Sequence, residues 1–184
     1  MSSKPTCVPA YFIMLLCLVL DQLTKTLVRV NMDLYERIYL LEKFFDDTFM
    51  LIHVENTGAA FSLGLGSDIV NRIFFITVTC LTILFIIYLL RKTDHRLQVV
   101  GFGFVLGGAL GNLLDRIMFG PVTDFFSVDF PDFIMERFPV FNIADSSIFI
   151  GVCFLIFDML FIKDQPVPKP EPLPEPQEIN IKEP

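Results

Sequence analysis

Long runs of apolar residues, separated by polar segments, fill the chain from about position 9 to position 162. Four of these runs are close to the length of about 20 residues that an α-helix needs to cross a bilayer. They are residues 9–30, 69–90, 97–117 and 145–162. The pattern predicts an α-helical integral membrane protein with four transmembrane helices.

Residues 31–68, between the first two runs, have a different pattern. Residues 35–41 and 48–54 are rich in aromatic and branched side chains, which is typical of short strands. Residues 55–62 contain glycine and other small residues, which suit a tight turn that approaches other backbone closely. We therefore expect a small sheet, which is either a plain surface feature or a platform over a cleft at membrane level.

The tail, residues 164–184, alternates proline with acidic and other polar residues. Such a composition buries too little apolar surface to offset chain entropy, so it predicts disorder. The chain thus divides into a membrane domain, residues 1–163, and this tail. Much of the net charge of −7 lies in the tail, so acidity does not identify a partner, and we expect no nucleic acid among the partners.

The short segment 91–96, between the second and third runs, is basic, and the positive-inside rule places it in the cytoplasm. Four spans then put both termini in the cytoplasm, with residues 31–68 and 118–144 facing outward, towards a periplasm or the external surface. The first run lacks a small-x-small cleavage site, so we interpret it as a spanning helix and not as a removable signal. The four cysteines lie in or beside the runs, and we expect no disulfide.

Two acidic residues, Asp124 and Asp145, lie where apolar segments meet polar ones. A carboxylate at a membrane border is costly to dehydrate and usually marks a function. A pair of them is able to share a proton and activate water. Structural alternatives exist for both: Asp124 closing a turn after Gly120, and Asp145 at the third position of a helix that Asn142 caps.

Further polar residues lie in the first and third runs. Asp21 and Lys25 have the i,i+4 spacing of an ion pair, and Asp21 lies deep enough to need a partner from another helix. Asn112, Asp115 and Arg116 end the third run. They form either a polar site that faces the bundle or an interfacial cap with a snorkelling arginine.

The third run also contains glycines at the small-xxx-small spacing. Gly103, Gly107 and Gly111 follow this spacing, which indicates close helix packing more than contact with a substrate. In the topology above, the polar residues of the different segments converge on the outer leaflet.

Five stretches, taken together, resemble the motifs of the bacterial lipoprotein signal peptidases, also called signal peptidase II, in order and spacing. They are residues 21–25, 56–61, 107–116, 122–125 and 141–146. The resemblance implies a four-helix aspartyl peptidase of the bacterial inner membrane with a small outward-facing β platform. It also implies cleavage of a prolipoprotein just before the cysteine that carries diacylglycerol.

Residue by residue, the resemblance makes Asp124 and Asp145 the catalytic pair. It implies that nine further residues support the site or bind substrate, with Asp115 bracing the third helix. The nine are Asp21, Lys25, Asn56, Gly58, Asn112, Asp115, Arg116, Asn142 and Ala144. The chain departs from the family in residues 126–138, which are longer and acidic.

The expected partners are diacylglyceryl-modified prolipoproteins and membrane lipids. We expect no metal and no cofactor, because the only histidines, His53 and His95, fall on opposite sides of the membrane and no His/Cys cluster has zinc-ligand spacing. A small ion-coupled transporter is the main alternative, since buried acids also serve ion pathways, and a structural membrane subunit is another. Signal-peptide release in proteoliposomes, without ion flux, distinguishes the peptidase.

Overall fold

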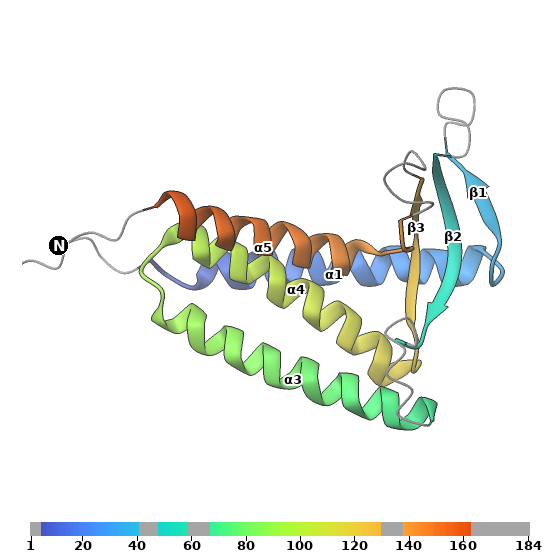
Figure 1. The fold of residues 1–184 in the computed structure, drawn as a ribbon, viewed down its shortest axis with the longest axis horizontal. Helices are drawn as coiled ribbons and strands as arrows, with labels where there is room; N and C mark the ends of the chain where they lie inside the picture. The colour runs from blue at the N-terminus through green and yellow to red at the C-terminus, as the bar shows by residue number, and fades with distance from the viewer. Residues whose placement is uncertain (1–4, 41–47, 59–66, 130–137, 163–184) are drawn as a thin grey trace, which may run out of the picture.

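The computed structural model describes residues 5–40, 48–58, 67–129 and 138–162. Its four long helices are each long and apolar enough to cross a membrane, and a sheet stands across one end of them (Figure 1). The helices are α1 (Val8–Asn31), α3 (Asp68–Lys92), α4 (Arg96–Met118) and α5 (Ile143–Phe161). The predicted class of four-helix membrane protein is confirmed.

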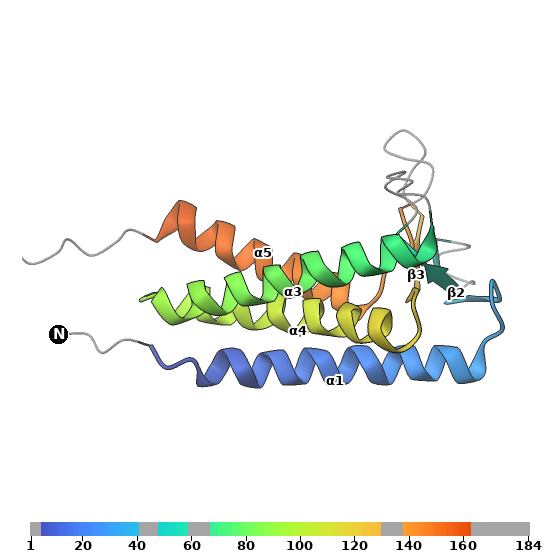
Figure 2. The ribbon, with the colours of Figure 1, turned by 90° about the horizontal axis from the view of Figure 1, so that it is seen from below.

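Helix α4 lies between the other helices (Figures 1 and 2). Most of its residues from Val99 to Asp115 are buried, whereas Leu90 is the only buried residue of α3. Glycines let the neighbouring backbones approach α4. A Cβ added at Gly107 would lie 2.6 Å from the Cβ of Cys17 in α1. The close packing predicted for these glycines is confirmed.

The sheet has three antiparallel strands in the order β1-β2-β3. The strands are β1 (Arg37–Tyr39), β2 (Phe49–Asn56) and β3 (Val122–Val128). The first two were predicted from the sequence, although β1 is shorter than expected, and β3 was not predicted. Phe125 of β3 packs with Val28 of α1 and with Met32, the residue that follows α1. This apolar contact fixes the sheet on the end of the helices.

The start of α1, the α3–α4 link and the end of α5 all lie at the end away from the sheet (Figures 1 and 2). This arrangement agrees with the predicted four-span topology, in which both loops that contain strands share one side. The direction of insertion remains a prediction. The tail, residues 164–184, and most of the acidic segment 126–138 lie outside the described residues.

Candidate active site

Two different elements position the two acids that the sequence singled out. Asp124 is in β3, opposite Val54 of β2, and its side chain is buried. The interpretation of Asp124 as a turn residue is therefore wrong, because the turn lies earlier, at Gly120, where φ is +101°. Asp145 lies in the first turn of α5 and is half-buried.

Asn142 connects the two acids. Its side-chain oxygen accepts a hydrogen bond from the backbone N–H of Asp145 at 2.9 Å, and its own backbone N–H donates to Asp145 Oδ2 at 3.2 Å. This reciprocal capping box begins α5, so the predicted cap is confirmed. The Asn142 Nδ2 also donates to Asp124 Oδ1 at 2.6 Å. Asn142 therefore both caps α5 and connects the two acids.

Asn112 of α4 orients Asp145 from the other side. Its Nδ2 donates to Asp145 Oδ1 at 2.8 Å, and its Oδ1 accepts from Lys25 Nζ at 2.8 Å. A lysine ammonium has only donors, so it requires the amide oxygen of Asn112 to face it. The amide nitrogen must then face Asp145. Lys25 in this way determines which group Asn112 presents to the acid.

Asn56, at the end of β2, orients Asp124 by the same logic. Its Nδ2 donates to Asp124 Oδ2 at 2.9 Å, while its Oδ1 accepts from the backbone N–H of Gly58 at 2.8 Å. Gly58 has φ +82°, in the left-handed region that favours glycine. A Cβ at Gly58 would lie 2.9 Å from Cζ of Phe75. Both conditions explain why glycine occupies this position.

A buried ion cluster lies next to these amides. Lys25 Nζ is 2.9 Å from Asp21 Oδ2 and 3.1 Å from Asp115 Oδ2, and all three side chains are fully buried. Asp21 Oδ1 also accepts the backbone N–H of Ala144 at 2.9 Å. The predicted ion pair and the predicted interhelical partner of Asp21 are both confirmed. The cluster joins α1, α4 and α5 directly beside Asp145.

Two residues of this cluster were not identified from the sequence. Gln22 Nε2 donates to Asp21 and to Asp115, each at 3.1 Å. Arg29 is 3.4 Å from Asp115 Oδ1 and donates to Thr123 Oγ1 at 3.0 Å. Helical periodicity was the available signal for Arg29, because it follows Lys25 by one i,i+4 step on the same face of α1.

Asp115 and Arg116 end α4 in different ways. Asp115 Oδ2 accepts the backbone N–H of Thr123 at 3.1 Å, which joins α4 to β3 one residue before Asp124. Arg116 Nη1 donates to the carbonyl oxygen of Asn112 at 3.2 Å, and its guanidinium lies 5.1 Å from the ring centre of Phe75. The charge of Arg116 also interacts with both acids of the pair.

Burial has a direct electrostatic effect on Asp124. It raises the pKa of this carboxyl from 3.8 to about 6, against the lowering effect of the Asn56 hydrogen bond and with a further increase from the charge of Asp145. Asp124 therefore keeps a proton well above the ordinary range of an aspartate. A carboxyl that retains its proton, next to a second carboxyl, is suited to acid and base catalysis.

The acids of the site are not arranged as metal ligands. Within the described ranges, no group of three His, Cys, Asp or Glu side chains is arranged as a metal site. The acids of the site contact amides and ammonium or guanidinium groups instead.

Comparison with known proteins gives a consistent result. Residues 13–161 match the family model described as signal peptidase (SPase) II. The lipoprotein signal peptidase of Desulforapulum autotrophicum is 40% identical over 159 residues, which cover 80% of this chain and 93% of that protein. The lipoprotein signal peptidase of Shouchella clausii is 40% identical over 153 residues, which cover 82% and 92%.

A solved structure described as a bacterial membrane enzyme has the same fold. It superposes with a TM-score of 0.75 at 27% identity, and the match covers 89% of this chain and 99% of that one.

Proposed function

The chain belongs to the signal peptidase II family, and we propose that Asp124 and Asp145 together activate the water that removes the signal peptide from its substrates. Family membership indicates lipoprotein signal peptidase activity and prolipoprotein substrates in a bacterial membrane. One observation carries the proposed pair: Asn142 hydrogen-bonds to Asp124 through its side chain and to Asp145 through its backbone.

In the proposed reaction, the two carboxyls share one proton. Two neighbouring acids ionise in two steps that belong to the pair, so one proton stays bound in the pH range between the two steps. We assign that proton to Asp124 at rest, because it is 2% exposed and its pKa is raised to about 6. Asp145 is half-buried and acts as the base.

Each proton transfer of the proposed reaction has a donor and an acceptor in the pair, the water or the substrate. Asp145 takes a proton from water, and the water oxygen attacks the carbonyl carbon of the scissile peptide bond. Asp124 gives its proton to the carbonyl oxygen. When the tetrahedral intermediate collapses, the peptide C–N bond breaks and the leaving amine receives the proton held by Asp145, while Asp124 takes back a proton from one hydroxyl as the carbonyl re-forms. The shared-proton state is restored when the products leave.

The surrounding residues have four proposed roles. Asn56, Asn112 and Asn142 donate N–H groups that set the directions of the carboxyl oxygens. The cluster around Lys25 holds Asn112 in the required orientation and carries no proton in the reaction. The positive charge of Arg116 stabilises the ionised member of the pair. Gly58 and Ala144 act through their backbone N–H groups.

The substrate's lipid is the proposed reason that the acids lie at a helix end. Asp124 and Asp145 lie at the sheet end of the bundle, where the diacylglyceryl group would anchor in the adjacent leaflet. We propose that cleavage occurs just before the lipid-bearing cysteine. The basic α3–α4 link supports an orientation in which this end faces the periplasm and both termini are cytoplasmic.

The test uses purified protein in proteoliposomes with two substrates. One is a diacylglyceryl-modified prolipoprotein, and the other is the same precursor without lipid. We expect cleavage of the first only, with mass spectrometry placing the new N-terminus at the modified cysteine. Cleavage at another bond, or equal cleavage of both precursors, would contradict the proposed specificity.

A further inference from the structure

An apolar groove lies between the acid pair and the α3–α4 link, on the face of α4 and α5 that is open to the bilayer. Its volume is about 370 Å³. Several of the side chains that line it are not covered by other residues of the protein, among them Phe149 and Phe157. The lining residues are Leu97, Phe149, Ile150, Cys153, Phe154 and Phe157. In a membrane, such a surface contacts hydrocarbon and not water.

The size of the groove matches one lipid chain. Phe149 and Phe157 are eight residues apart in α5, a rise of about 12 Å along the helix, close to the roughly 15 Å of one leaflet's hydrocarbon. A chain in the groove gains dispersion contacts that an empty groove would lack.

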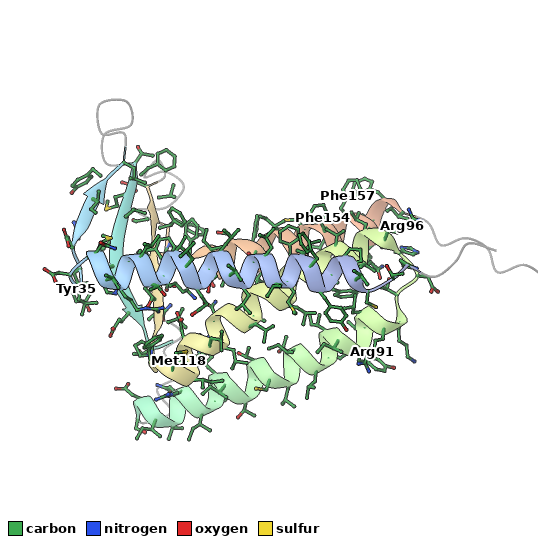
Figure 3. The ribbon with its side chains drawn as sticks, turned by 180° about the vertical axis from the view of Figure 1, so that it is seen from behind. Tyr35, Arg91, Arg96, Met118, Phe154 and Phe157 are labelled. Atoms are coloured by element: carbon green, nitrogen blue, oxygen red, sulfur yellow. The ribbon has the colours of Figure 1, made fainter. Side chains whose placement is uncertain are left out.

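The charged residues at the end of the groove near the α3–α4 link indicate which lipid headgroup suits it. Arg96 directly precedes the groove residue Leu97, is exposed, and lies towards the end away from the sheet, as Phe157 also does (Figure 3). Arg91 and Lys92 are also exposed in the last turn of α3 at this end. Among the described residues, the acids at this end are Asp94, which is exposed, and Asp158, which is buried and lies 2.8 Å from His95 Nδ1. The three basic residues therefore leave an excess of positive charge. Basic residues at a helix end, next to a groove between helices, suit an anionic headgroup.

We propose that this groove binds one acyl chain of an anionic phospholipid whose phosphate pairs with Arg96. The groove begins about one helical turn after Asp145 and extends towards the α3–α4 link, so the proposed headgroup lies at the end of the helices opposite the acid pair. The proposal does not depend on the catalytic assignment.

The chain contains no tryptophan, so one introduced tryptophan is a unique fluorescent reporter. Phe154→Trp places it in the groove. Phe85→Trp is the matched control, because Phe85 is exposed on α3, outside the groove, and lies as far from the end of its helix as Phe154 does. Both variants enter vesicles of phosphatidylcholine with a minor fraction of phosphatidylglycerol. In one set of vesicles the phosphatidylglycerol carries brominated acyl chains, and in the other set the phosphatidylcholine does. The mole fraction of brominated lipid is the same in both sets.

We expect brominated phosphatidylglycerol to quench the Phe154→Trp reporter more strongly than brominated phosphatidylcholine does. One basic residue should enrich phosphatidylglycerol in the groove about fivefold. The Phe85→Trp control should be quenched equally by both. Adding Arg96→Gln should remove the preference, and Arg96→Lys should retain it. Phe157→Trp replaces the groove reporter if Phe154→Trp does not fold.

Two results would overturn the proposal. Equal quenching of the groove reporter by both lipids would mean that no anionic headgroup is selected. Protection of that reporter from both lipids, with normal quenching of the control, would mean that protein covers the groove.

Discussion

The side chain of Asn142 donates to Asp124 at 2.6 Å while its backbone N–H donates to Asp145 at 3.2 Å. The residue that begins α5 is therefore also the residue that relates the two acids. A helix cap is an efficient place for such a link, because the cap geometry is fixed by the helix itself. Removing the Asn142 side chain should affect both folding and chemistry.

Asn142→Ala should lower the cleavage rate about 100-fold, because misplacing a catalytic group by about 1 Å costs this much. It should also lower the unfolding free energy by about 1 kcal/mol through loss of the cap. Single-turnover cleavage and thermal unfolding in detergent measure the two effects. Ser67→Ala is the matched control, because Ser67 caps a different helix, α3, through its side chain and is exposed. If both variants lost activity equally, Asn142 would be only a cap.

The pH profile of kcat/KM should be bell-shaped, since the active pair carries one proton. The pKa of Asp124 is raised from 3.8 to about 6, so its proton is lost only as the pH rises through about 6. The alkaline limb should therefore lie near pH 6 for the free enzyme, above the ordinary aspartate range. The acid limb arises because a second proton on the pair removes its base.

Chelators provide the control for this profile. An acid pair needs no metal, so the profile should be unchanged by a chelator. Activity that disappears with the chelator and returns with a divalent metal would contradict the pair mechanism.

Lys25→Met should destabilise the protein by about 3–5 kcal/mol, because it leaves the carboxylates of Asp21 and Asp115 buried without their cation. Activity should fall as well, since Asn112 loses the donor that orients its amide. Thermal unfolding and cleavage assays measure these effects. Lys92→Met, at an exposed position of α3, is the matched control and should change neither. Wild-type stability in Lys25→Met would show that the cluster does not hold the helices together.

The sequence predicted the parts of the fold whose signals are local. The four apolar runs predicted the helices to within a few residues, and the spacing of Asn142 and Asp145 predicted the cap of α5. Strand β3 was missed because its first four residues are all buried, between β2 and the end of α1. A strand buried on both faces has no alternation of polar and apolar positions to reveal it.

The contacts of the site were predictable only in part. The Asp21–Lys25 pair is local to one helix and was identified from its spacing. The link from Gln22 to Asp115 and the link from Arg29 to Thr123 join positions far apart in the chain. No pattern within α1 indicates which distant residue these side chains meet.

Deletion of residues 164–184 should leave cleavage unchanged. All the proposed site residues precede this tail, and its Pro-rich acidic composition disfavours packing. The proposed topology also places it across the membrane from the acid pair. The full-length and truncated proteins should have equal kcat/KM in detergent. A truncated protein that inserts normally but no longer cleaves would show that the tail acts on the site.

The most direct test of the acid pair is single-turnover cleavage of a diacylglyceryl prolipoprotein by purified Asp124→Asn and Asp145→Asn variants. Asparagine preserves the volume of each side chain but cannot hold the shared proton, so each variant should lose at least about 10²–10⁴-fold in rate while remaining folded. Asp33→Asn, at an exposed position beside the end of α1, is the matched control and should retain full activity. Near-normal turnover by either folded variant would contradict the assignment of Asp124 and Asp145 as the catalytic pair.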